Sequence, residues 1–341
     1  MKFSFKIKKV FAFAFLSAAL ASAFCNDFQN QGKGELWSLS FSPYAGIRNG
    51  VQQEFVFGEN VLGENAALSE LNWDMKNLYL AGINAKGKFY GAFVEAGFKS
   101  ALTGKCGTVA DSDWSNVESV SPLDEKYFYK THYSEHDNNV KSYFELSIKA
   151  GYDFNLSEKI TVSPFVQLEY WNSDFLGQNG TGWYVTSGNY PYTQWETYGT
   201  KNDYTGQDVI RLERIVYSAW AGFSFKADVN DRFSLLYGFA FCPYINVKSL
   251  DSHFTRNRYF YDEMDKVSAG MRFNMAAEFN FNSYNKIYFK AEYLKTGTAT
   301  GTTKYSTQRD GYFSLIDDSS GAAFQWAEFS LGYTLSFRHP K

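Results

Sequence analysis

The stretch Trp326-Ala327-Glu328-Phe329-Ser330-Leu331-Gly332-Tyr333-Thr334-Leu335-Ser336-Phe337 lies near the end of this 341-residue chain and alternates strictly between two kinds of residue. Successive side chains of a β-strand point to opposite faces. One face of this segment, from Phe329 to Phe337, would be apolar, and the other would carry Glu328 and small polar residues. Alternation sustained over about ten residues, with charge on the second face, is typical of a strand that crosses a membrane in a closed barrel.

The same alternation recurs upstream. Four more apolar faces follow the period of two, and they run through Phe144–Phe154, Ile215–Phe225, Phe233–Phe241 and Val267–Phe279. Aromatic residues make up 19% of the chain. A membrane barrel uses such residues in girdles at its two interfaces, whereas a soluble sandwich rarely needs so many. The aromatic content therefore supports the membrane interpretation.

The connections between these segments alternate between short and long. Short turns are expected near 85–87, 156–158, 230–231 and 283–285, and long polar connections near 58–67, 102–140, 176–208, 250–264 and 300–322. Outer-membrane barrels show this asymmetry between periplasmic turns and outer loops. The pattern predicts ten strands at roughly 35–57, 68–84, 87–101, 141–154, 159–175, 209–226, 231–249, 265–282, 285–299 and 323–338.

We therefore predict an all-β fold, namely a ten-stranded antiparallel transmembrane β-barrel with long outer loops and short periplasmic turns. An even number of strands places both termini on the periplasmic side. A ring of ten strands is narrow, so inward side chains should fill it rather than leave a channel.

The N-terminal residues 1–23 have the features of a signal peptide, which leaves a barrel domain at 24–341. A lysine-rich start precedes the apolar run Val10–Leu20 and the cleavage signal Ala21-Ser22-Ala23. Three cysteines are too few for a disulfide framework. The full chain holds 36 acidic against 33 basic residues, and this balance argues against a nucleic-acid partner.

Two polar clusters are the candidate chemistry of the chain. Asp111-Ser112-Asp113-Trp114 and Asp251-Ser252-His253 follow the predicted third and seventh strands, in two long loops expected to lie across one mouth. Side chains at i and i+2 of an extended segment project the same way. Asp251 would then hold His253 as a general base, and Asp111 and Asp113 would share a proton while binding a water molecule.

Two observations weigh against a catalytic interpretation. An Asp-x-Asp segment in an outer loop is usually a solvated acidic turn or half of a weak calcium site. Continuing the alternation from Phe241 also places Asp251 and His253 on the lipid-facing side. A bulge or a loss of regular pairing between Val247 and Asp251 would be needed to turn them inward.

The ordered set of motifs resembles the omptin family of outer-membrane proteases. Ser69-Glu70-Leu71-Asn72-Trp73 is similar to a segment of the family's second strand, and the Asp-x-Asp-Trp motif follows about forty residues later, as in the family. Ser134-Glu135-His136-Asp137 and then Asp251-x-His253 complete the set. The resemblance implies that water held between Asp111/Asp113 and Asp251/His253 attacks the scissile carbonyl directly, without a covalent intermediate, a metal or another cofactor.

The residues that select the substrate in the family are matched less completely in this sequence. The family prefers basic residues because of acidic groups in its pocket, and Gly50-x-x-x-Glu54 is similar to one such segment. Glu54 shares the even parity of lumen-facing serines, although an ordinary lumen carboxylate would do the same. Ser249 and His132 stand where two further acids are expected. A weakened or altered preference follows. The resemblance also implies a lipopolysaccharide partner, whose binding residues the sequence does not place.

The leading hypothesis is thus an outer-membrane endopeptidase that faces the cell exterior and cleaves proteins or peptides, with Glu54 as a substrate-binding residue. The alternative is a non-enzymatic surface adhesin or receptor barrel of omptin ancestry, and a small pore is a third interpretation. His132 and His136, with neighbouring acids, form a possible metal set, but we expect solvated histidines in this long polar segment.

Overall fold

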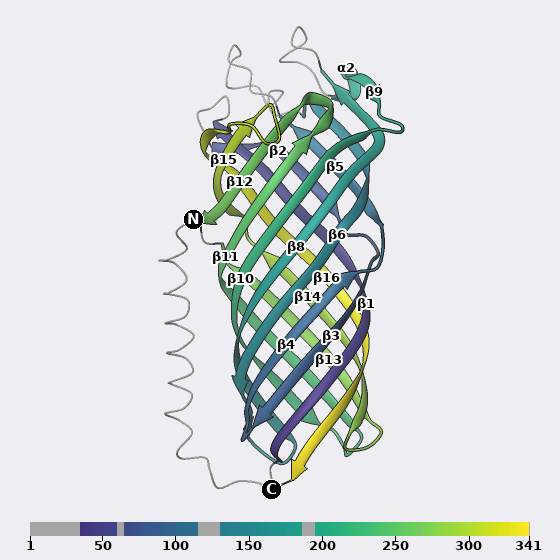
Figure 1. Cartoon of the computed structure of the whole chain (residues 1–341), viewed down its shortest axis with the longest axis vertical. Helices are drawn as coiled ribbons and strands as arrows, with labels where there is room; N and C mark the ends of the chain where they lie inside the picture. Colours follow the sequence, from purple (N-terminus) through teal and green to yellow (C-terminus); the bar gives the residue numbers. More distant parts are fainter. Residues whose placement is uncertain (1–34, 60–64, 115–129, 186–194, 267, 341) are drawn as a thin grey trace.

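The computed structural model describes residues 35–59, 65–114, 130–185, 195–266 and 268–340. Ten antiparallel strands form a closed ring, because the last strand pairs with the first along almost its whole length. Figure 1 shows the resulting tall cylinder. In ring order the strands are β1 (Glu35–Glu59), β3 (Leu78–Phe89), β4 (Ala92–Ala101), β6 (His132–Tyr152), β8 (Ile160–Tyr184), β10 (Asp208–Asp228), β11 (Phe233–His253), β13 (Gly270–Asn280), β14 (Asn285–Thr296) and β16 (Ser314–Pro340).

The predicted ten-stranded antiparallel arrangement is confirmed. Glu35 pairs with Pro340, so both ends of the described chain lie at the end of the cylinder with the short turns. The predicted signal peptide at 1–23 lies outside the described residues. Within those residues, no helix is both long and apolar enough to span a membrane.

Toward the opposite end, the ring is continued by four additional strands. They are β2 (Asn65–Asp74), β5 (Lys105–Asp113), β12 (Arg258–Lys266) and β15 (Ala299–Ser306). They replace β3, β4, β13 and β14, so the ring order there becomes β1-β2-β5-β6-β8-β10-β11-β12-β15-β16. The predicted loops at 102–140 and 250–264 are therefore partly strand. The prediction that the two polar clusters lie in loops is wrong, because they lie on β5 and β11.

Smaller elements extend this long-loop end. β9 (Thr200–Asp203) pairs with β8 and follows the short helix α2 (Trp195–Tyr198). At the other end, β7 (Phe154–Asn155) pairs with β8 beside one of the short turns.

The short turns match the predictions with one exception. The connections near 156–158, 230–231 and 283–285 are turns between neighbouring strands. The turn expected at 85–87 instead falls at Tyr90-Gly91, where the backbone φ angles are +49° and +92°, as a tight two-residue hairpin requires. The segment 85–87 suggests a turn because Lys86 and Lys88 are polar, but these lysines line the interior of the ring.

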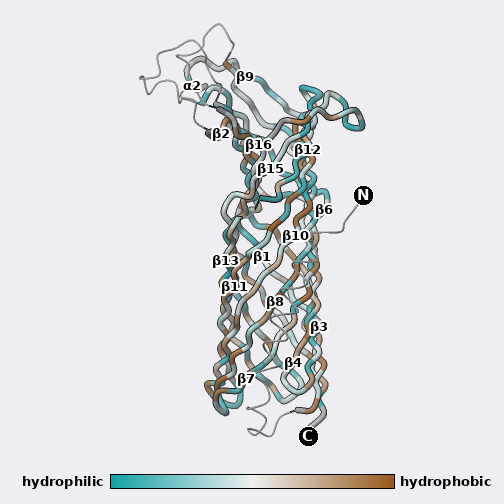
Figure 2. Tube along the Cα trace, turned by 90° about the vertical axis from the view of Figure 1, so that its left-hand side faces the viewer, coloured by the Kyte–Doolittle hydropathy of each residue, from teal (hydrophilic) through white to brown (hydrophobic). Residues whose placement is uncertain are grey.

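The half of the cylinder near the short turns is apolar on its outside. The alternating face predicted for the last strand is exposed, with Leu331 63% exposed, while Glu328 and Ser330 on the opposite face are buried. The same exposed belt runs around the ring, and Figure 2 shows hydrophobic residues along the shaft below a more hydrophilic flared end. Its members include Leu39, Phe41, Ile83, Val94, Phe98, Ile148, Leu168, Phe223, Phe241, Phe273, Met275 and Phe289. Such a belt is the surface that a lipid bilayer covers.

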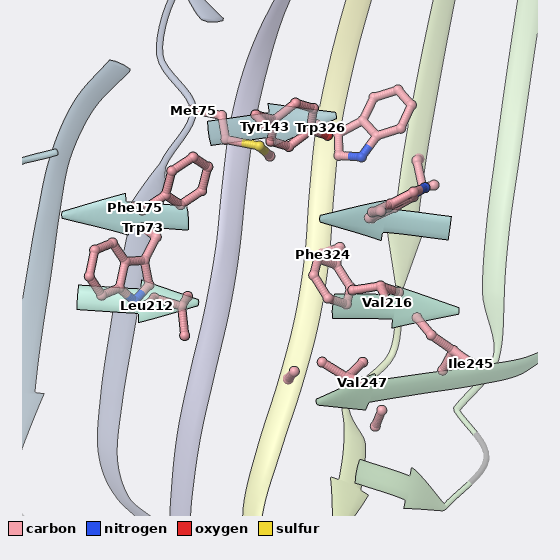
Figure 3. Packing of buried hydrophobic residues seen from close by; sticks show 14 of the residues in the cluster. Trp73, Met75, Tyr143, Phe175, Leu212, Val216, Ile245, Val247, Phe324 and Trp326 are labelled. Carbon is pink, nitrogen blue, oxygen red and sulfur yellow. The ribbon is translucent and has the colours of Figure 1, made fainter. Parts of the chain in front are cut away.

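Above this apolar belt the two faces exchange character. On β10, Leu212 and Val216 point inward and are buried, whereas Arg211 and Glu213 lie half exposed on the outside. The interior at this level is an apolar core that includes Trp73, Met75, Phe175, Leu212, Val216, Phe324 and Trp326, seen in Figure 3. The upper part of the ring thus packs like a water-soluble protein.

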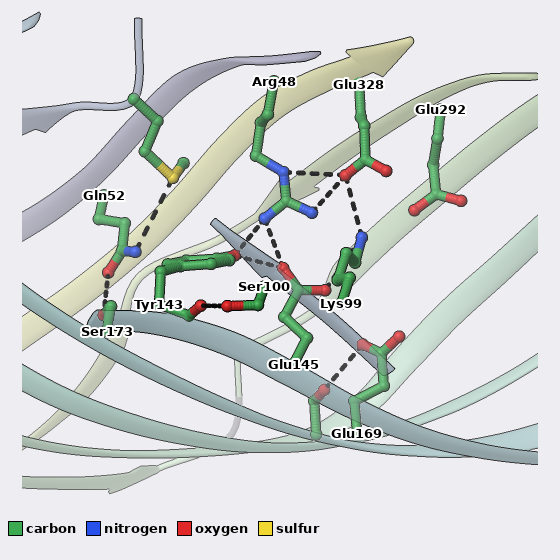
Figure 4. A network of polar contacts seen from close by, with 12 residues as sticks. Arg48, Gln52, Lys99, Ser100, Tyr143, Glu145, Glu169, Ser173, Glu292 and Glu328 are labelled. Atoms are coloured by element: carbon green, nitrogen blue, oxygen red, sulfur yellow. Dashed lines mark hydrogen bonds and ion pairs between the residues drawn. The ribbon is translucent and has the colours of Figure 1, made fainter. Parts of the chain in front are cut away.

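A polar layer lies just below this core (Figure 4). Arg48 is 0% exposed and donates to Glu328 from Nη2 and to Glu145 from Nη1, both over 2.5 Å. Lys99 Nζ lies 3.1 Å from Glu145 and 2.9 Å from Glu328. The Arg48 guanidinium also lies 3.9 Å from the centre of the Trp326 ring, so it joins the polar layer to the apolar core.

The interior is only partly filled, which corrects the expectation of a fully packed ring. Below the polar layer lies a cavity of about 1710 Å³ lined mostly by polar and charged side chains. Above it, the polar layer and the apolar core fill the interior with side chains. This plug is unfavourable to the pore interpretation.

A bulge on β11 turns the second polar cluster inward. Cys242 and Pro243 together stand opposite the single residue Trp220, and the pairing shifts register there. Before the bulge an odd-numbered residue such as Phe241 faces outward, and after it Asp251 faces inward. A bulge was expected between Val247 and Asp251; it occurs earlier, where β13 gives way to β12 as the neighbour of β11.

Arg48 gives a test of the polar layer. Replacing it in Arg48→Met removes one of the two cations between Glu145 and Glu328 and should lower the free energy of unfolding by roughly 3–5 kcal/mol. The urea midpoint of the protein in detergent micelles, followed by tryptophan fluorescence, measures this loss. Lys141→Met, at an exposed lysine of β6, is the matched control. Equal midpoints for both variants would contradict the role given to Arg48.

Candidate functional site

The two polar clusters meet inside the long-loop end of the ring. β5 and β11 belong to opposite sides of the upper ring, separated on one side by β6, β8 and β10. Side chains from both reach a small cavity of about 10 Å³, close to the space that one water molecule needs. Its lining consists of Asp111, Ser134, His136, Tyr184, Val209, Ile210, His253, Thr255 and Arg256. The predicted proximity of Asp111 and His253 is thus observed.

On β11, Asp251 and His253 form a hydrogen-bonded pair. His253 Nε2 lies 2.6 Å from Asp251 Oδ2, and both side chains are largely buried. The imidazole also meets the edge of the Phe260 ring, with 5.5 Å between ring centres. Burial disfavours the charged imidazole, but Asp251 outweighs burial and raises the pKa of His253 above its usual 6.5. The pair therefore favours a protonated ring with a fixed orientation.

On β5, Asp111 is the buried member of its cluster. It is 6% exposed, whereas Asp113 is half buried. Burial, and then the nearby charge of Asp113, raise the pKa of Asp111 to about 7, while His253 and Arg256 act in the opposite direction. Asp111 Oδ1 is a buried oxygen without a hydrogen-bond partner among the described residues, and an oxygen of this kind is satisfied by an ordered water.

Arg256 is a cavity residue that the sequence motifs did not indicate. It ends η4 (Phe254–Arg256), the single turn that follows His253. Its Nη2 lies 3.8 Å from Asp111 Oδ2, and its guanidinium lies 5.5 Å from the centre of the Tyr184 ring. A cation therefore lies at the edge of the cavity between the two clusters.

Glu54 points into the ring, as its parity predicted, but it already has a partner. Arg214 from β10 donates to Glu54 Oε2 over 3.0 Å and to Ser249 Oγ over 2.9 Å. All three side chains are buried. The carboxylate proposed to bind a substrate is thus neutralised by a guanidinium of the same chain.

Another buried carboxylate lies near Glu54 and Arg214. Asp262 on β12 is buried and accepts a hydrogen bond from Thr303 over 2.7 Å. Burial, the largest effect, raises its pKa to about 7, and the nearby Asp251 acts in the same direction. Burial lowers the pKa of Arg214, while the nearby charges of Glu54, Asp262 and Asp251 act in the opposite direction.

The two histidines of β6 differ from the expectation of solvated side chains. His136 is buried, with Nδ1 2.5 Å from the Asn179 carbonyl and Nε2 3.0 Å from Ser134 Oγ. Burial lowers its pKa. The His132 ring lies tilted against the Tyr184 ring, with 5.5 Å between ring centres. In the described part of the chain, no three His, Cys, Asp or Glu residues gather as a metal set.

Comparisons with known proteins place this geometry in context. The model of the Omptin family matches residues 37–337. The outer membrane protease OmpT from Escherichia coli has a similar fold, with a TM-score of 0.75 and 13% identity over 88% of this chain and 97% of that chain. No curated protein sequence matched the chain.

A second solved structure is far less similar. The translocator domain of the autotransporter NalP from Neisseria meningitidis gives a TM-score of 0.38 and 8% identity over 97% of this chain and 98% of that one. That score is too low to relate the two folds in detail, and the likeness to OmpT at 13% identity concerns the fold alone. The family model, in contrast, spans nearly all of the described strands, and the chain belongs to the Omptin family.

Proposed function

We propose that the protein is an outer-membrane endopeptidase whose site faces the cell exterior. In this proposal Asp111, Asp113, Asp251 and His253 are catalytic and activate one water molecule against a peptide bond. The apolar belt would lie in the bilayer, and the long-loop end with the site would project beyond it. The family match and the exposed belt support this placement.

The observation that carries the proposal is the cavity between the two clusters. It has room for about one water molecule and is lined by Asp111 from β5 and His253 from β11. The unpartnered Asp111 Oδ1 offers that water an acceptor. Because Nε2 of His253 faces Asp251, its Nδ1 is the ring atom left to accept a proton.

The proposed reaction begins with proton transfer from the water to His253 Nδ1. Asp251 stabilises the imidazolium that forms. The second hydrogen stays on the water oxygen and donates a hydrogen bond to Asp111, which holds that oxygen toward the substrate. The new oxygen–carbon bond converts the scissile carbonyl to a tetrahedral oxyanion. No side chain becomes covalently attached to the substrate.

The intermediate then collapses, and the carbon–nitrogen bond breaks. His253 returns its proton to the departing nitrogen, which leaves as an amine, while the other product is a carboxylic acid. His253 is neutral again after this step. The proton that it accepted from water has moved to the leaving group, so the cycle closes without another reactant.

Substrate selection is proposed to differ from a simple preference for basic residues. Glu54 remains our candidate for substrate binding, but the guanidinium of Arg214 offsets its charge. A cationic substrate side chain would have to compete with Arg214. The requirement for lipopolysaccharide stays a prediction of the family resemblance.

Removal of either half of the site provides the first test. The kcat/KM of Asp111→Asn and His253→Ala on a mixed peptide library should fall by roughly 10²–10⁴-fold, because each variant loses a proton-transfer or water-holding group. Asp203→Asn, at an exposed aspartate of β9, is the matched control. Wild-type rates in both site variants would eliminate the proposal, and an inactive wild type that binds surface ligands would favour the adhesin or receptor alternative.

The pH dependence provides a second test. Asp111 must be ionised and His253 neutral, and the pKa of each is raised, that of Asp111 to about 7. The kcat/KM should therefore rise with pH through the neutral range rather than near pH 4, as one coupled transition. Asp113→Asn removes a like charge and should move this transition to lower pH. Profiles between about pH 5 and 9 measure it, and an unmoved transition would remove Asp113 from the site.

The orientation of the site can be tested on whole cells. Cells that carry the protein in the outer membrane should cleave an added folded protein that is too large to pass the membrane. Cells carrying Asp111→Asn should not. Cleavage that appears only after the cells are opened would place the site on the periplasmic side.

A further inference from the structure

Nine residues line the water-sized cavity, and Arg256 is the one that carries a guanidinium. We propose that Arg256 is a catalytic residue that stabilises the oxyanion formed when water attacks the scissile carbonyl. This inference rests on the proposed function, because it concerns a charge that arises in that reaction. It assigns a role to a residue outside the two clusters.

The need for such a cation follows from the charges around the cavity. Asp111, Asp113 and Asp251 place three carboxyl groups around the reacting atoms. A developing oxyanion in this buried site would be repelled by every ionised carboxylate near it, and the repulsion is strong because little water screens it. His253 becomes cationic when it accepts the proton, but it returns that proton as the intermediate collapses. Arg256 supplies a positive charge that persists through both steps.

Arg256 shares a side-chain hydrogen bond with Tyr184, which engages one of the five N–H donors of a guanidinium and leaves the others for a substrate. The distance of 3.8 Å from Nη2 to Asp111 Oδ2 exceeds the length of a hydrogen bond, so the two groups attract without a close, two-pronged pair. The Tyr184 ring lies beside the guanidinium at 5.5 Å. A guanidinium that packs against an aromatic ring still directs its N–H groups outward in its own plane.

The partial exposure of Arg256 also suits contact with a substrate. Its side chain is 36% exposed, against 7% for that of Asp111. Arg256 therefore both lines the cavity and reaches the solvent. A peptide lying over the cavity would bring its carbonyl oxygen to the level of the guanidinium while its carbonyl carbon faces the water.

The backbone fixes Arg256 relative to the proposed base. His253 pairs with Arg258 where β11 meets β12, so Arg256 belongs to the short connection between these two residues. Asn257 closes that connection with a left-handed φ of +48°, a conformation that asparagine adopts more readily than most residues. Base and cation are thus held by one tight hairpin.

The experiment compares Arg256→Gln, Arg256→Lys and Arg256→Ala with the wild type. Arg256→Gln should lower kcat by roughly 10²–10³-fold with little change in KM, and Arg256→Lys should recover part of the loss. Added guanidinium ion should restore activity to Arg256→Ala and not to Asp111→Asn. Arg258→Gln, at an exposed arginine of the same hairpin, is the matched control.

A binding measurement separates this inference from the proposed function. A peptide phosphonamidate carries a tetrahedral anion in place of the scissile amide. The wild type should bind it roughly 10²-fold more tightly than Arg256→Gln does, while both bind an uncleaved peptide equally. Equal affinity for the phosphonamidate would overturn the role of Arg256, even if Asp111→Asn confirms the hydrolysis. Faster cleavage by Arg256→Gln would also overturn it, because Arg256 would then obstruct the site.

Discussion

Closure of β1 against β16 is the constraint on which the rest of this structure depends. A ring without free edges pairs the backbone of every spanning strand with its two neighbours, which is what allows a sheet to stand in lipid. Closure also directs every second side chain into one narrow interior. The polar ones must find partners there, because a buried unpaired charge is costly. The polar layer meets this requirement, because Arg48 and Lys99 are paired there with Glu145 and Glu328.

Alternation predicted the strands well where lipid faces one side, because only there are outward residues apolar and inward residues polar. Phe329 and Leu331 lie on the exposed face and Glu328 on the buried face, as their parity indicates. Above the apolar belt the faces exchange character, and Leu212 points inward beside outward Arg211 and Glu213. The upper strands therefore look like polar loops in the sequence. A single extra residue at Cys242-Pro243 also reverses the parity of β11, and such a bulge has no reliable sequence signal.

The candidate site also contains residues that the sequence indicates and residues that it does not. Its acids and His253 stand out because two short motifs place them at spacings of two residues, and the folded ring brings Asp111 and His253 to one cavity. The basic residues do not stand out. Arg214 could have been assigned to the interior from its even parity on β10, but nothing in the sequence pairs it with Glu54 on β1. Arg256 lies three residues beyond a motif, in a turn whose course depends on the left-handed Asn257.

The protonation states that hydrolysis needs at this site are the ones that stabilise the fold least. A carboxyl group whose pKa rises on folding contributes stability that is complete below its unfolded pKa and is lost as the pH rises through the folded value. Asp111 therefore stabilises the fold least above about pH 7. The raised pKa of His253 acts in the same direction. Hydrolysis would need the deprotonated form of both groups, which is the form that folding disfavours. The closed ring that carries the site, joined through β1 and β16, must therefore supply the stability that the site gives up.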